Sequence, residues 1–392
     1  MRKYREAIVL AGGFGTRLAH VVPDVCKPMA PVAGRPFLRF VMDQLAAAGV
    51  ERVVVADGYR REQIEAYFGD FYRGMDVAYS PEGEPLFTGG AVKQALARCE
   101  GDWVFVMNGD TWLDIDFAAM EAAAEGGAPE GVKAAVAVKR MRSFERYGTV
   151  DVDAEGTITA FHEKCPCADG LINAGVYLVR RDALDAMPAK FSLESDWFER
   201  VVTDGVLRAC VCEGGFIDIG VPEDYERAQR LLAPLAHGCR LAMFDRDGTI
   251  NVDAGHLHEP EKLELIPKTV ETMARYAADP ECKVVVVTNQ AGIAKGLYAE
   301  EDMRALHRFM EQELEKRGAR VDAWYFCSHH PDFTGECSCR KPAPGMLLAA
   351  MRDFDTRPEN CVMYGDKPSD EAAAEAAGVE FIFAGEGAGY VQ

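Results

Sequence analysis

LAMFDRDGTIN, residues 241–251, joins an apolar run to two carboxylates, Asp245 and Asp247, just past the middle of the 392-residue chain. A buried strand over the apolar run delivers both aspartates at its carboxyl end, where parallel α/β sheets hold their ligands. Carboxylates this close need a cation or a shared proton, which indicates a magnesium site. With magnesium holding a phosphate, the first aspartate can attack the phosphorus atom and the second can carry out the proton transfer. The alternative is an ordinary DxDG turn after a strand.

The composition indicates a folded chain of two domains, with three as the alternative, because 392 residues exceed one hydrophobic core. The net charge of −20 predicts no nucleic-acid partner and no anionic membrane partner. The charged start MRKYREAIVLAGG runs into a strand, and no apolar run reaches the length of a membrane span. We therefore expect a cytoplasmic protein, whose twelve cysteines are reduced or bind metal.

Strand and helix patterns alternate along the first half of the chain. Apolar runs predict strands at residues 7–10, 52–56 and 103–107, and helical periodicity predicts helices at 36–48, 61–68, 89–99 and 222–232. This alternation predicts a mostly parallel sheet that is covered on both faces.

A glycine-rich loop, AGGFGTRL, follows the first of these strands. Glycines let successive backbone amides approach a ligand and form an anion-binding nest. Arg17, together with Lys27 in the following VCKPMAPVAG segment, adds positive charge for a triphosphate. The loop is neither the Rossmann nor the Walker pattern, and its alternative role is a plain β-turn-α connection.

Two isolated aspartates, Asp110 after WVFVM and Asp218 in FIDIG, also follow apolar strands. Together they can hold one magnesium ion, although either alone is equally explained as a turn or helix-cap residue. Two Cys-x-Cys pairs lack a second pair at metal-binding spacing. We expect Cys210 and Cys212 to share one face of a strand, and Cys165 and Cys167 to be loop thiols.

Residues 1–232 resemble sugar-1-phosphate nucleotidyltransferases, and among them the D-glycero-α-D-manno-heptose 1-phosphate guanylyltransferases. The stretches that carry this resemblance are LAGGFGTRL, KPMAPVAGRPFL, EPLFTGGAVKQAL, NGDTWLDID, RYGTVDVD, FHEK, INAGVYL and FIDIGVPEDYERAQ. The resemblance implies in-line attack of a sugar phosphate on the α-phosphorus of a nucleoside triphosphate, with release of pyrophosphate. Positioning and charge neutralisation suffice for this chemistry.

The resemblance also implies residue roles. Arg17 and Lys27 neutralise the phosphates, and Asp110 and Asp218 bind magnesium. The nucleotide is expected at Leu10, Ala11, Gly12, Gly13, Gly15, Thr16, Arg17, Lys27, Gly89 and Asn108, and the sugar phosphate at Glu163, Lys164, Asn173 and Gly175. GTP is the favoured nucleotide, but Phe87 replaces a small residue before TGG and leaves the base open.

The segment APLAHGCR, residues 233–240, is a short joint, and the second domain spans 241–392. Its patterns predict helices at 269–277 and 300–317 and strands at 283–287, 321–327 and 361–364. Thr288 then lies at the same sheet edge as Asp245, within reach of a phosphate oxygen, unless it is merely a strand-end threonine. Asp366 joins Asp245 and Asp247 as a magnesium ligand, and Lys341 balances the carboxylates.

Residues 241–392 resemble the haloacid-dehalogenase superfamily of aspartate-nucleophile phosphatases, most of all the heptose 1,7-bisphosphate phosphatases, with histidinol-phosphate phosphatases as near relatives. FDRDGTIN, HEPEKLELIP, TNQAGIAKG, CSHHP, CSCRKPAPG and GDKPSD carry the resemblance. It implies that Asp245 forms an aspartyl phosphate and that Asp247 protonates the leaving alcohol and later activates water. It further implies that Asn289 and Arg340 contact the substrate and that Lys341 orients the nucleophile.

A second metal signal lies between these motifs, in Cys327-Ser-His329 and Cys337-Ser-Cys339. Three thiolates and one imidazole suit a closed, structural zinc site. His330 is an alternative ligand, and scattered reduced thiols are the alternative to a site.

The two halves together predict an α/β protein with two doubly wound, mostly parallel-sheet domains. The predicted function is a bifunctional phosphatase and guanylyltransferase of GDP-heptose synthesis, with magnesium in both active sites and one structural zinc. Its partners are heptose phosphates and a nucleoside triphosphate. Two alternatives are a hexose 1-phosphate transferase fused to another small-molecule phosphatase, and a non-catalytic first half that senses nucleotide sugars. The oligomeric state stays open.

Overall fold

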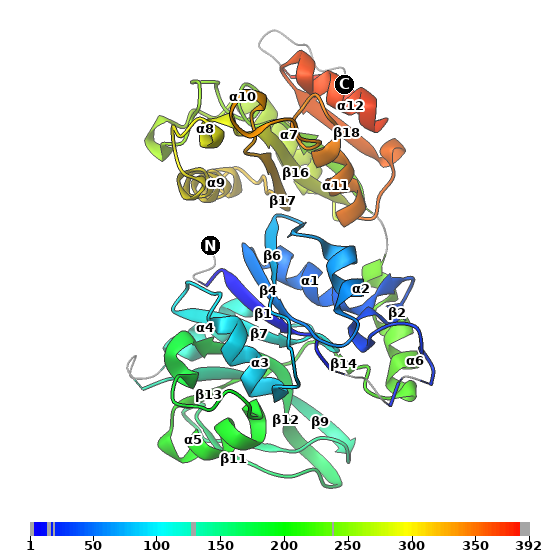
Figure 1. Cartoon of the computed structure of the whole chain (residues 1–392), viewed down its shortest axis with the longest axis vertical. Coiled ribbons are helices and arrows are strands. Elements are labelled where there is room, and N and C mark those ends of the chain that lie inside the picture. Colours follow the sequence, from blue (N-terminus) through cyan, green and yellow to red (C-terminus); the bar gives the residue numbers. More distant parts are fainter. Residues whose placement is uncertain (1–3, 14–16, 19, 127–130, 237–238, 385–392) are drawn as a thin grey trace. The chain divides into compact units, whose positions relative to one another are not determined.

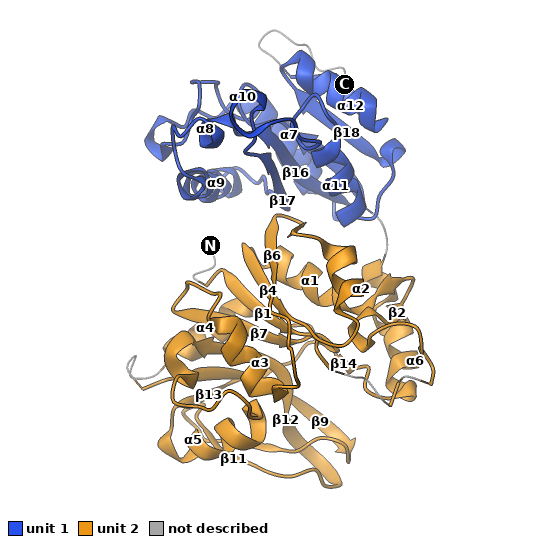
Figure 2. Ribbon diagram, in the orientation of Figure 1, with its two compact units in different colours: residues 1, 237–392 blue, residues 2–236 orange. Residues whose placement is uncertain are grey.

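The chain forms two compact units, residues 2–236 and residues 237–392, which differ in colour in Figure 2. The structure is a computed structural model, and it describes residues 4–13, 17–18, 20–126, 131–236 and 239–384 (Figure 1). In these ranges no helix is long and apolar enough to cross a membrane.

The N-terminal unit is built on an eight-stranded sheet with the order β13-β9-β12-β7-β1-β4-β6-β5. Its middle is parallel and consists of β7 (Trp103–Asn108), β1 (Glu6–Leu10), β4 (Arg52–Ala56) and β6 (Met75–Tyr79). Beyond it, β13 (Leu207–Cys212) pairs parallel with β9 (Ala134–Phe144), whereas β12 (Cys167–Arg180) and the edge strand β5 (Phe71–Tyr72) are antiparallel to their neighbours. The predicted mostly parallel α/β sheet is confirmed, with β12 as its main exception.

Helices cover both faces of this sheet, because its strands are apolar on both sides. Along β1, Ala7 and Val9 belong to one core and Ile8 to the other. The longer helices are α1 (Phe37–Ala47), α2 (Arg61–Phe68), α3 (Phe87–Leu96), α4 (Phe117–Glu125) and α6 (Pro222–Leu231). The short elements that matter below are the 3-10 turn η1 (Lys27–Met29), the π-helical turn η3 (Leu193–Phe198), β8 (Thr111–Leu113) and β14 (Phe216–Asp218).

Two details of the N-terminal unit bear on the sequence predictions. Cys210 and Cys212 are both buried in β13, as predicted. Cys167, predicted to lie in a loop, is instead the first residue of β12, because it pairs with Phe144 of β9. No disulfide joins any of the twelve cysteines, all of which lie in the described ranges.

The C-terminal unit has a fully parallel five-stranded sheet with the order β17-β16-β15-β18-β19. The strands are β15 (Arg240–Phe244), β16 (Cys282–Asn289), β17 (Ala323–Cys327), β18 (Cys361–Gly365) and β19 (Glu380–Phe383). The helices are α7 (Pro267–Ala277), α8 (Ala291–Ala294), α9 (Glu300–Glu315), α10 (Pro331–Thr334), α11 (Gly345–Asp353) and α12 (Pro368–Ala377). Parallel strands end at one edge, so the residues after β15 and β18 meet there.

Candidate active sites

The polar centre of the N-terminal unit is a cluster of one lysine and two aspartates. Lys27 Nζ lies 2.5 Å from Asp110 Oδ2 and 3.4 Å from Asp218 Oδ1. The antiparallel pair β8–β14 joins the two aspartates, because Asp218 pairs with Thr111, the neighbour of Asp110. Burial alone would lower the pKa of Lys27, but the two carboxylates raise it. Burial and the nearby Asp110 raise the pKa of Asp218.

Arg17 converges on the same cluster. A Cβ atom placed on Gly220 would lie 2.9 Å from Asp218 Oδ1, 3.4 Å from Lys27 Nζ and 3.6 Å from Arg17 Nη2. The side chains of Arg17, Lys27 and Asp218 therefore all approach the backbone of Gly220, where a larger residue would collide with them. Two nucleotide-binding residues predicted beside Arg17, Gly15 and Thr16, lie outside the described residues.

The remaining residues predicted for the nucleotide have varied surroundings. Leu10 ends β1, and its carbonyl accepts from Gly109 N at 2.8 Å, while Ala11 N donates to the Ala56 carbonyl at 2.7 Å. Gly12 lies against Glu82, since a Cβ there would be 2.5 Å from Glu82 Oε1, whereas no atom of the described residues lies within 4 Å of a Cβ on Gly13.

Gly89 and Asn108 each pack closely against another residue of this unit, Gly89 against Phe191 and Asn108 against Gly175. A Cβ on Gly89 would lie 2.2 Å from the ring of Phe191, so this glycine permits helix α3 to pack closely there. Asn108 Nδ2 would lie 2.6 Å from a Cβ on Gly175, whose φ of +74° also favours glycine. The side-chain amide of Asn108 thus packs against the backbone of β12 at Gly175, where any side chain would displace it.

A pocket of about 560 Å³ joins this cluster to the residues predicted for the sugar phosphate. Its lining includes Glu163, Lys164, Asn173 and Gly175, together with Asn108 and Asp218. Asn173 Oδ1 accepts from Gly175 N at 3.0 Å, and its amide donates to Tyr177 Oη at 3.0 Å. These contacts fix the bulge of β12 that faces the pocket.

Sequence reasoning missed Glu194, which also lines the pocket. Its carboxylate accepts from Thr88 Oγ1 at 2.7 Å, from Ser192 Oγ at 3.1 Å and from Tyr177 Oη at 3.3 Å. Glu194 lies in η3, more than eighty residues after Asp110, in a stretch with no motif that signals a ligand.

In the C-terminal unit, Lys341 is buried between two carboxylates. Its Nζ lies 2.6 Å from Asp245 Oδ1 and 2.7 Å from Asp370 Oδ1, and it donates to the Val287 carbonyl at 2.7 Å. Burial raises the pKa of Asp245 to about 6, an effect that Lys341 opposes and Asp370 reinforces. The ion pair with Lys341 favours the ionised form of Asp245, which is the form that a nucleophilic carboxylate requires.

Asp366 completes an acidic group with Asp245 and Asp370, whose ligand atoms lie within 4.8 Å of one another. A Cβ on Gly248 would lie 2.2 Å from Asp366 Oδ2, and Gly248 has a φ of +94°, so only glycine allows this approach. Burial raises the pKa of Asp366, with Asp370 adding to the effect. Asp370 was not predicted, because at the start of α12 it reads as a helix-cap residue.

Asp247, predicted as a third magnesium ligand, is not a member of this acidic group. Its two carboxylate oxygens accept from the guanidinium of Arg246 at 3.1 and 2.9 Å, from Asn251 Nδ2 at 3.2 Å and from Gln290 Nε2 at 3.2 Å. The side chain of Asp247 is thus held by four donors, which stabilise its ionised form.

Two of the three predicted substrate residues of this unit line a pocket of about 350 Å³, and Thr288 does not. Asn289 and Arg340 line it, and Asn289 also exchanges two hydrogen bonds with the backbone of Lys341, at 3.0 and 3.1 Å. Thr288 is buried, and its hydroxyl accepts from Gln290 Nε2 at 2.8 Å. Arg340 Nη1 donates to the His329 carbonyl at 3.1 Å.

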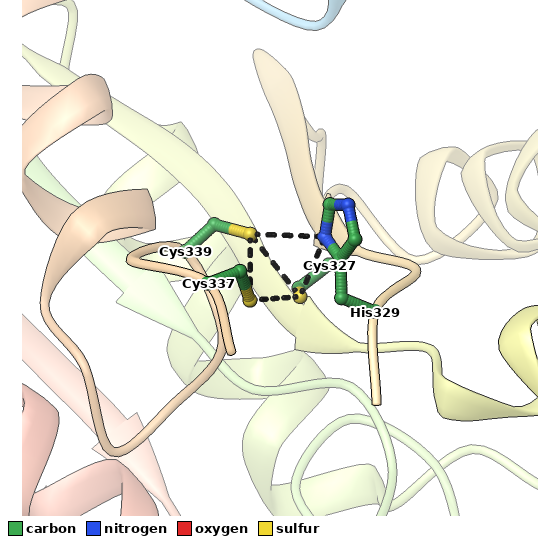
Figure 3. A group of neighbouring side chains, drawn as sticks. All are labelled: Cys327, His329, Cys337 and Cys339. Carbon is green, nitrogen blue, oxygen red and sulfur yellow. Dashed lines mark hydrogen bonds between the residues drawn. The ribbon is translucent and has the colours of Figure 1, made fainter. Parts of the chain in front are cut away.

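The predicted metal-binding cysteines and histidine lie together (Figure 3), with Cys327 as the last residue of β17 and the other three after it. Cys339 Sγ lies 3.2 Å from Cys327 Sγ, 3.4 Å from Cys337 Sγ and 3.4 Å from His329 Nδ1. Ligands of a tetrahedral zinc with bonds of about 2.3 Å lie roughly 3.7 Å apart, so this donor set fits zinc. His330 instead caps α10 by accepting from Asp332 N, and it is not in the group.

Comparison with known families and proteins agrees with the two sites. Residues 6–234 match the family model described as Nucleotidyl transferase, and residues 338–390 match the one described as HAD-hydrolase-like. The chain is 41% identical over 222 residues to D-glycero-alpha-D-manno-heptose 1-phosphate guanylyltransferase of Campylobacter jejuni subsp. jejuni serotype O:2, which covers 56% of this chain and 96% of that protein.

Two further relatives match one unit each. Over 141 residues the chain is 41% identical to D-glycero-beta-D-manno-heptose-1,7-bisphosphate 7-phosphatase of Yersinia pestis, covering 35% of this chain and 74% of that protein. The crystal structure of HddC from Yersinia pseudotuberculosis complexed with GMP-PN superposes with a TM-score of 0.52 at 33% identity, covering 58% of this chain and 99% of that chain.

Proposed function

Because the chain belongs to the nucleotidyl transferase family over residues 6–234, we propose that it is a bifunctional enzyme of GDP-heptose synthesis. The C-terminal unit removes the 7-phosphate of D-glycero-D-manno-heptose 1,7-bisphosphate. The N-terminal unit then joins the resulting heptose 1-phosphate to a guanylyl group from GTP and releases pyrophosphate. We assign residues 1–232 and 241–392 to these activities, with 233–240 as the linker.

The observation that carries this proposal is that both polar centres are assembled in one chain. Lys27 with Asp110 and Asp218 forms one, and Lys341 with Asp245 and Asp370 forms the other. The relatives of both units are named for reactions on D-glycero-D-manno-heptose phosphates. GTP is supported by the guanylyltransferase relatives and by the GMP-PN complex of HddC.

Each polar centre also has donors that suit its metal. We propose that Asp110 and Asp218, which both contact Lys27, hold one magnesium. We further propose that Asp245 and Asp366 hold another, with Asp247 nearby, and that Cys327, His329, Cys337 and Cys339 hold zinc. Magnesium would neutralise charge on the phosphates, whereas a zinc with four protein ligands would be structural.

The phosphatase pocket suits a substrate with a second anionic group. Lys295, Arg340 and Lys367 line it, together with His256 and the carboxylates Asp247 and Asp253, while Asp245 is buried beside Lys341, which also lines the pocket. A phosphate on Asp245 and a second phosphate among these cations is the arrangement that a bisphosphate requires.

The two proposed reactions must also agree on the anomer of the heptose phosphate that passes from one to the other. The phosphatase relatives are named for the β-anomer and the guanylyltransferase relatives for the α-anomer. Consecutive reactions must use one anomer, and we propose the α-anomer, the one for which the guanylyltransferase relatives are named.

A two-stage assay tests the whole proposal. Purified protein with magnesium receives each anomer of D-glycero-D-manno-heptose 1,7-bisphosphate, and free phosphate is measured. Each nucleoside triphosphate is then added in turn and pyrophosphate is measured. We expect phosphate from the α-anomer and pyrophosphate with GTP. Phosphate without pyrophosphate from any nucleotide would reject the transferase activity and leave the phosphatase.

A further inference from the structure

Arg246 is a buried cation that the proposed chemistry leaves without a role. It stands between the two reactive aspartates in sequence, and its side chain is 0% exposed. Burying a guanidinium is costly unless its donors are paired. Its partners therefore indicate why it is there.

Four of the five N–H groups of Arg246 have partners that hold the guanidinium in one orientation. Nε and Nη2 donate to the two oxygens of Asp247, at 3.1 and 2.9 Å. Nη2 also donates to the Leu257 carbonyl at 2.9 Å, and Nη1 lies 3.1 Å from His307 Nε2. The fork that faces Asp247 is bidentate, which fixes the plane of the carboxyl group as well as its position.

His307 is placed so that it can only accept from this arginine. It is buried on α9, and burial together with the charge of Arg246 lowers its pKa well below the ordinary value, so its ring is neutral. The ring stacks on Trp324 of β17, with centroids 3.8 Å apart and planes 11° apart. Trp324 Nε1 in turn donates to Glu311 Oε1 of α9 at 2.7 Å.

Asp247 has a second support, from Gln290, on the oxygen that also accepts from Arg246 Nη2. Gln290 Nε2 donates to Asp247 Oδ2 at 3.2 Å, and the Tyr298 hydroxyl donates to Gln290 Oε1 at 2.6 Å, which sets the amide orientation. Asp247 is thus bound by two side chains, Arg246 and Gln290, whose own orientations are fixed by His307 and Tyr298.

We propose that Arg246, locked by His307, is a positioning residue that presents the Asp247 carboxyl group for proton transfer with the leaving oxygen. This inference rests on the proposed phosphatase function. In the first half-reaction an oxygen of Asp245 attacks phosphorus, the P–O bond to the sugar breaks, and the departing oxygen takes the proton of Asp247. The hydrogen-bond donors around Asp247 then stabilise the carboxylate that forms when the proton leaves. In the second half-reaction that carboxylate takes a proton from the attacking water.

The leaving group distinguishes positioning from a merely structural role. An alkoxide needs the proton from Asp247, whereas p-nitrophenolate departs without one. The value of kcat/KM reports the first half-reaction, so it is unaffected by later hydrolysis of the aspartyl phosphate. We therefore compare kcat/KM for heptose 1,7-bisphosphate with kcat/KM for p-nitrophenyl phosphate.

Arg246→Lys keeps the charge and removes the fork. We expect kcat/KM for the sugar ester to fall about 10²-fold, at the lower end of general acid–base contributions, and kcat/KM for the aryl ester to fall no more than about threefold. His307→Phe keeps the stack and removes the acceptor, and should lower only the sugar-ester value, about tenfold. His307→Gln restores an acceptor and should recover most of that loss.

Glu301→Gln, on the exposed side of α9, is the matched control and should change neither value. Equal losses on both esters in the folded variants, shown by unchanged melting temperatures, would overturn the proposal. No loss on the sugar ester would overturn it as well. If the wild-type protein does not hydrolyse the heptose ester, the proposed function fails, and the comparison is made with a hexose 6-phosphate that it does hydrolyse.

Discussion

Lys341 contributes both to the proposed catalysis and to the stability of the C-terminal unit, because it neutralises two buried carboxylates. It is 3% exposed and bonds both Asp245 and Asp370, so its removal leaves two buried carboxylates without a cation. Breaking a buried pair of this kind costs about 3–5 kcal/mol. Lys341→Met should therefore abolish phosphate release and lower the unfolding free energy of the C-terminal unit by about 3 kcal/mol in urea titrations.

A double variant separates the two effects of Lys341. Adding Asp370→Asn removes one of the two stranded charges, so Lys341→Met/Asp370→Asn should regain stability relative to Lys341→Met while staying inactive. A double variant that is less stable than the single one would contradict this account.

Asp57 is a buried carboxyl group whose charge opposes folding. It is 0% exposed, and neither oxygen has a hydrogen-bond partner within the described ranges. Burial raises its pKa to about 6, helped by Glu65. Since the folded protein binds this proton more tightly than the unfolded chain, the stability contribution of Asp57 falls as pH rises from about 4 to 6 and stays low above that.

Asp57→Asn should therefore stabilise the N-terminal unit at pH 7.5, by on the order of 2 kcal/mol, and hardly at all near pH 4. Thermal unfolding at both pH values measures the difference. Asp102→Asn, at a side chain that is 90% exposed, is the control. An equal gain at both pH values would show that the charge of Asp57 is not the cause.

The metal-binding loop shows how one element connects to a site. It holds Cys327 at the end of β17 beside Cys337 and Cys339, and Arg340 follows at once and bonds the His329 carbonyl. We expect Cys337→Ser to lower bound zinc, measured by mass spectrometry, and to destabilise the C-terminal unit. Phosphatase KM should rise with little change in transferase activity, because Arg340 loses its support.

Cys165→Ser, at an exposed thiol of the other unit, is the control for the zinc measurement. A Cys337→Ser protein that keeps its full zinc content would remove Cys337 from the ligand set.

Helices and strands that have a clear hydrophobic pattern could be predicted from the sequence. Contacts between residues that are distant in the sequence could not. The apolar runs of β1, β4 and β7 predicted buried strands because both faces are covered, and α2 begins and ends where its periodicity indicated. Cys167 was misplaced because the pairing of β12 with β9 depends on a partner more than twenty residues away. Asp370 and Arg246 were missed because a helix-start aspartate and an arginine between two aspartates have ordinary local explanations.

At the scale of the whole molecule, each unit has its own sheet, core and polar centre. The eight-stranded sheet carries Lys27, Asp110 and Asp218, and the five-stranded sheet carries Asp245 and Lys341. Neither centre borrows one of these residues from the other unit. The two proposed reactions should therefore be separable by substitution, even though the product of one is the substrate of the other.

Asp245→Asn should abolish phosphate release, by about 10³-fold or more, because the nucleophile is lost, and leave pyrophosphate release from heptose 1-phosphate within about twofold. Asp218→Asn should do the reverse. A mixture of the two variants should then convert heptose bisphosphate and GTP to the nucleotide sugar, since free heptose 1-phosphate passes between molecules. Loss of both activities in either single variant would contradict independent sites, and a mixture that releases phosphate but makes no nucleotide sugar would show that the intermediate must stay within one chain.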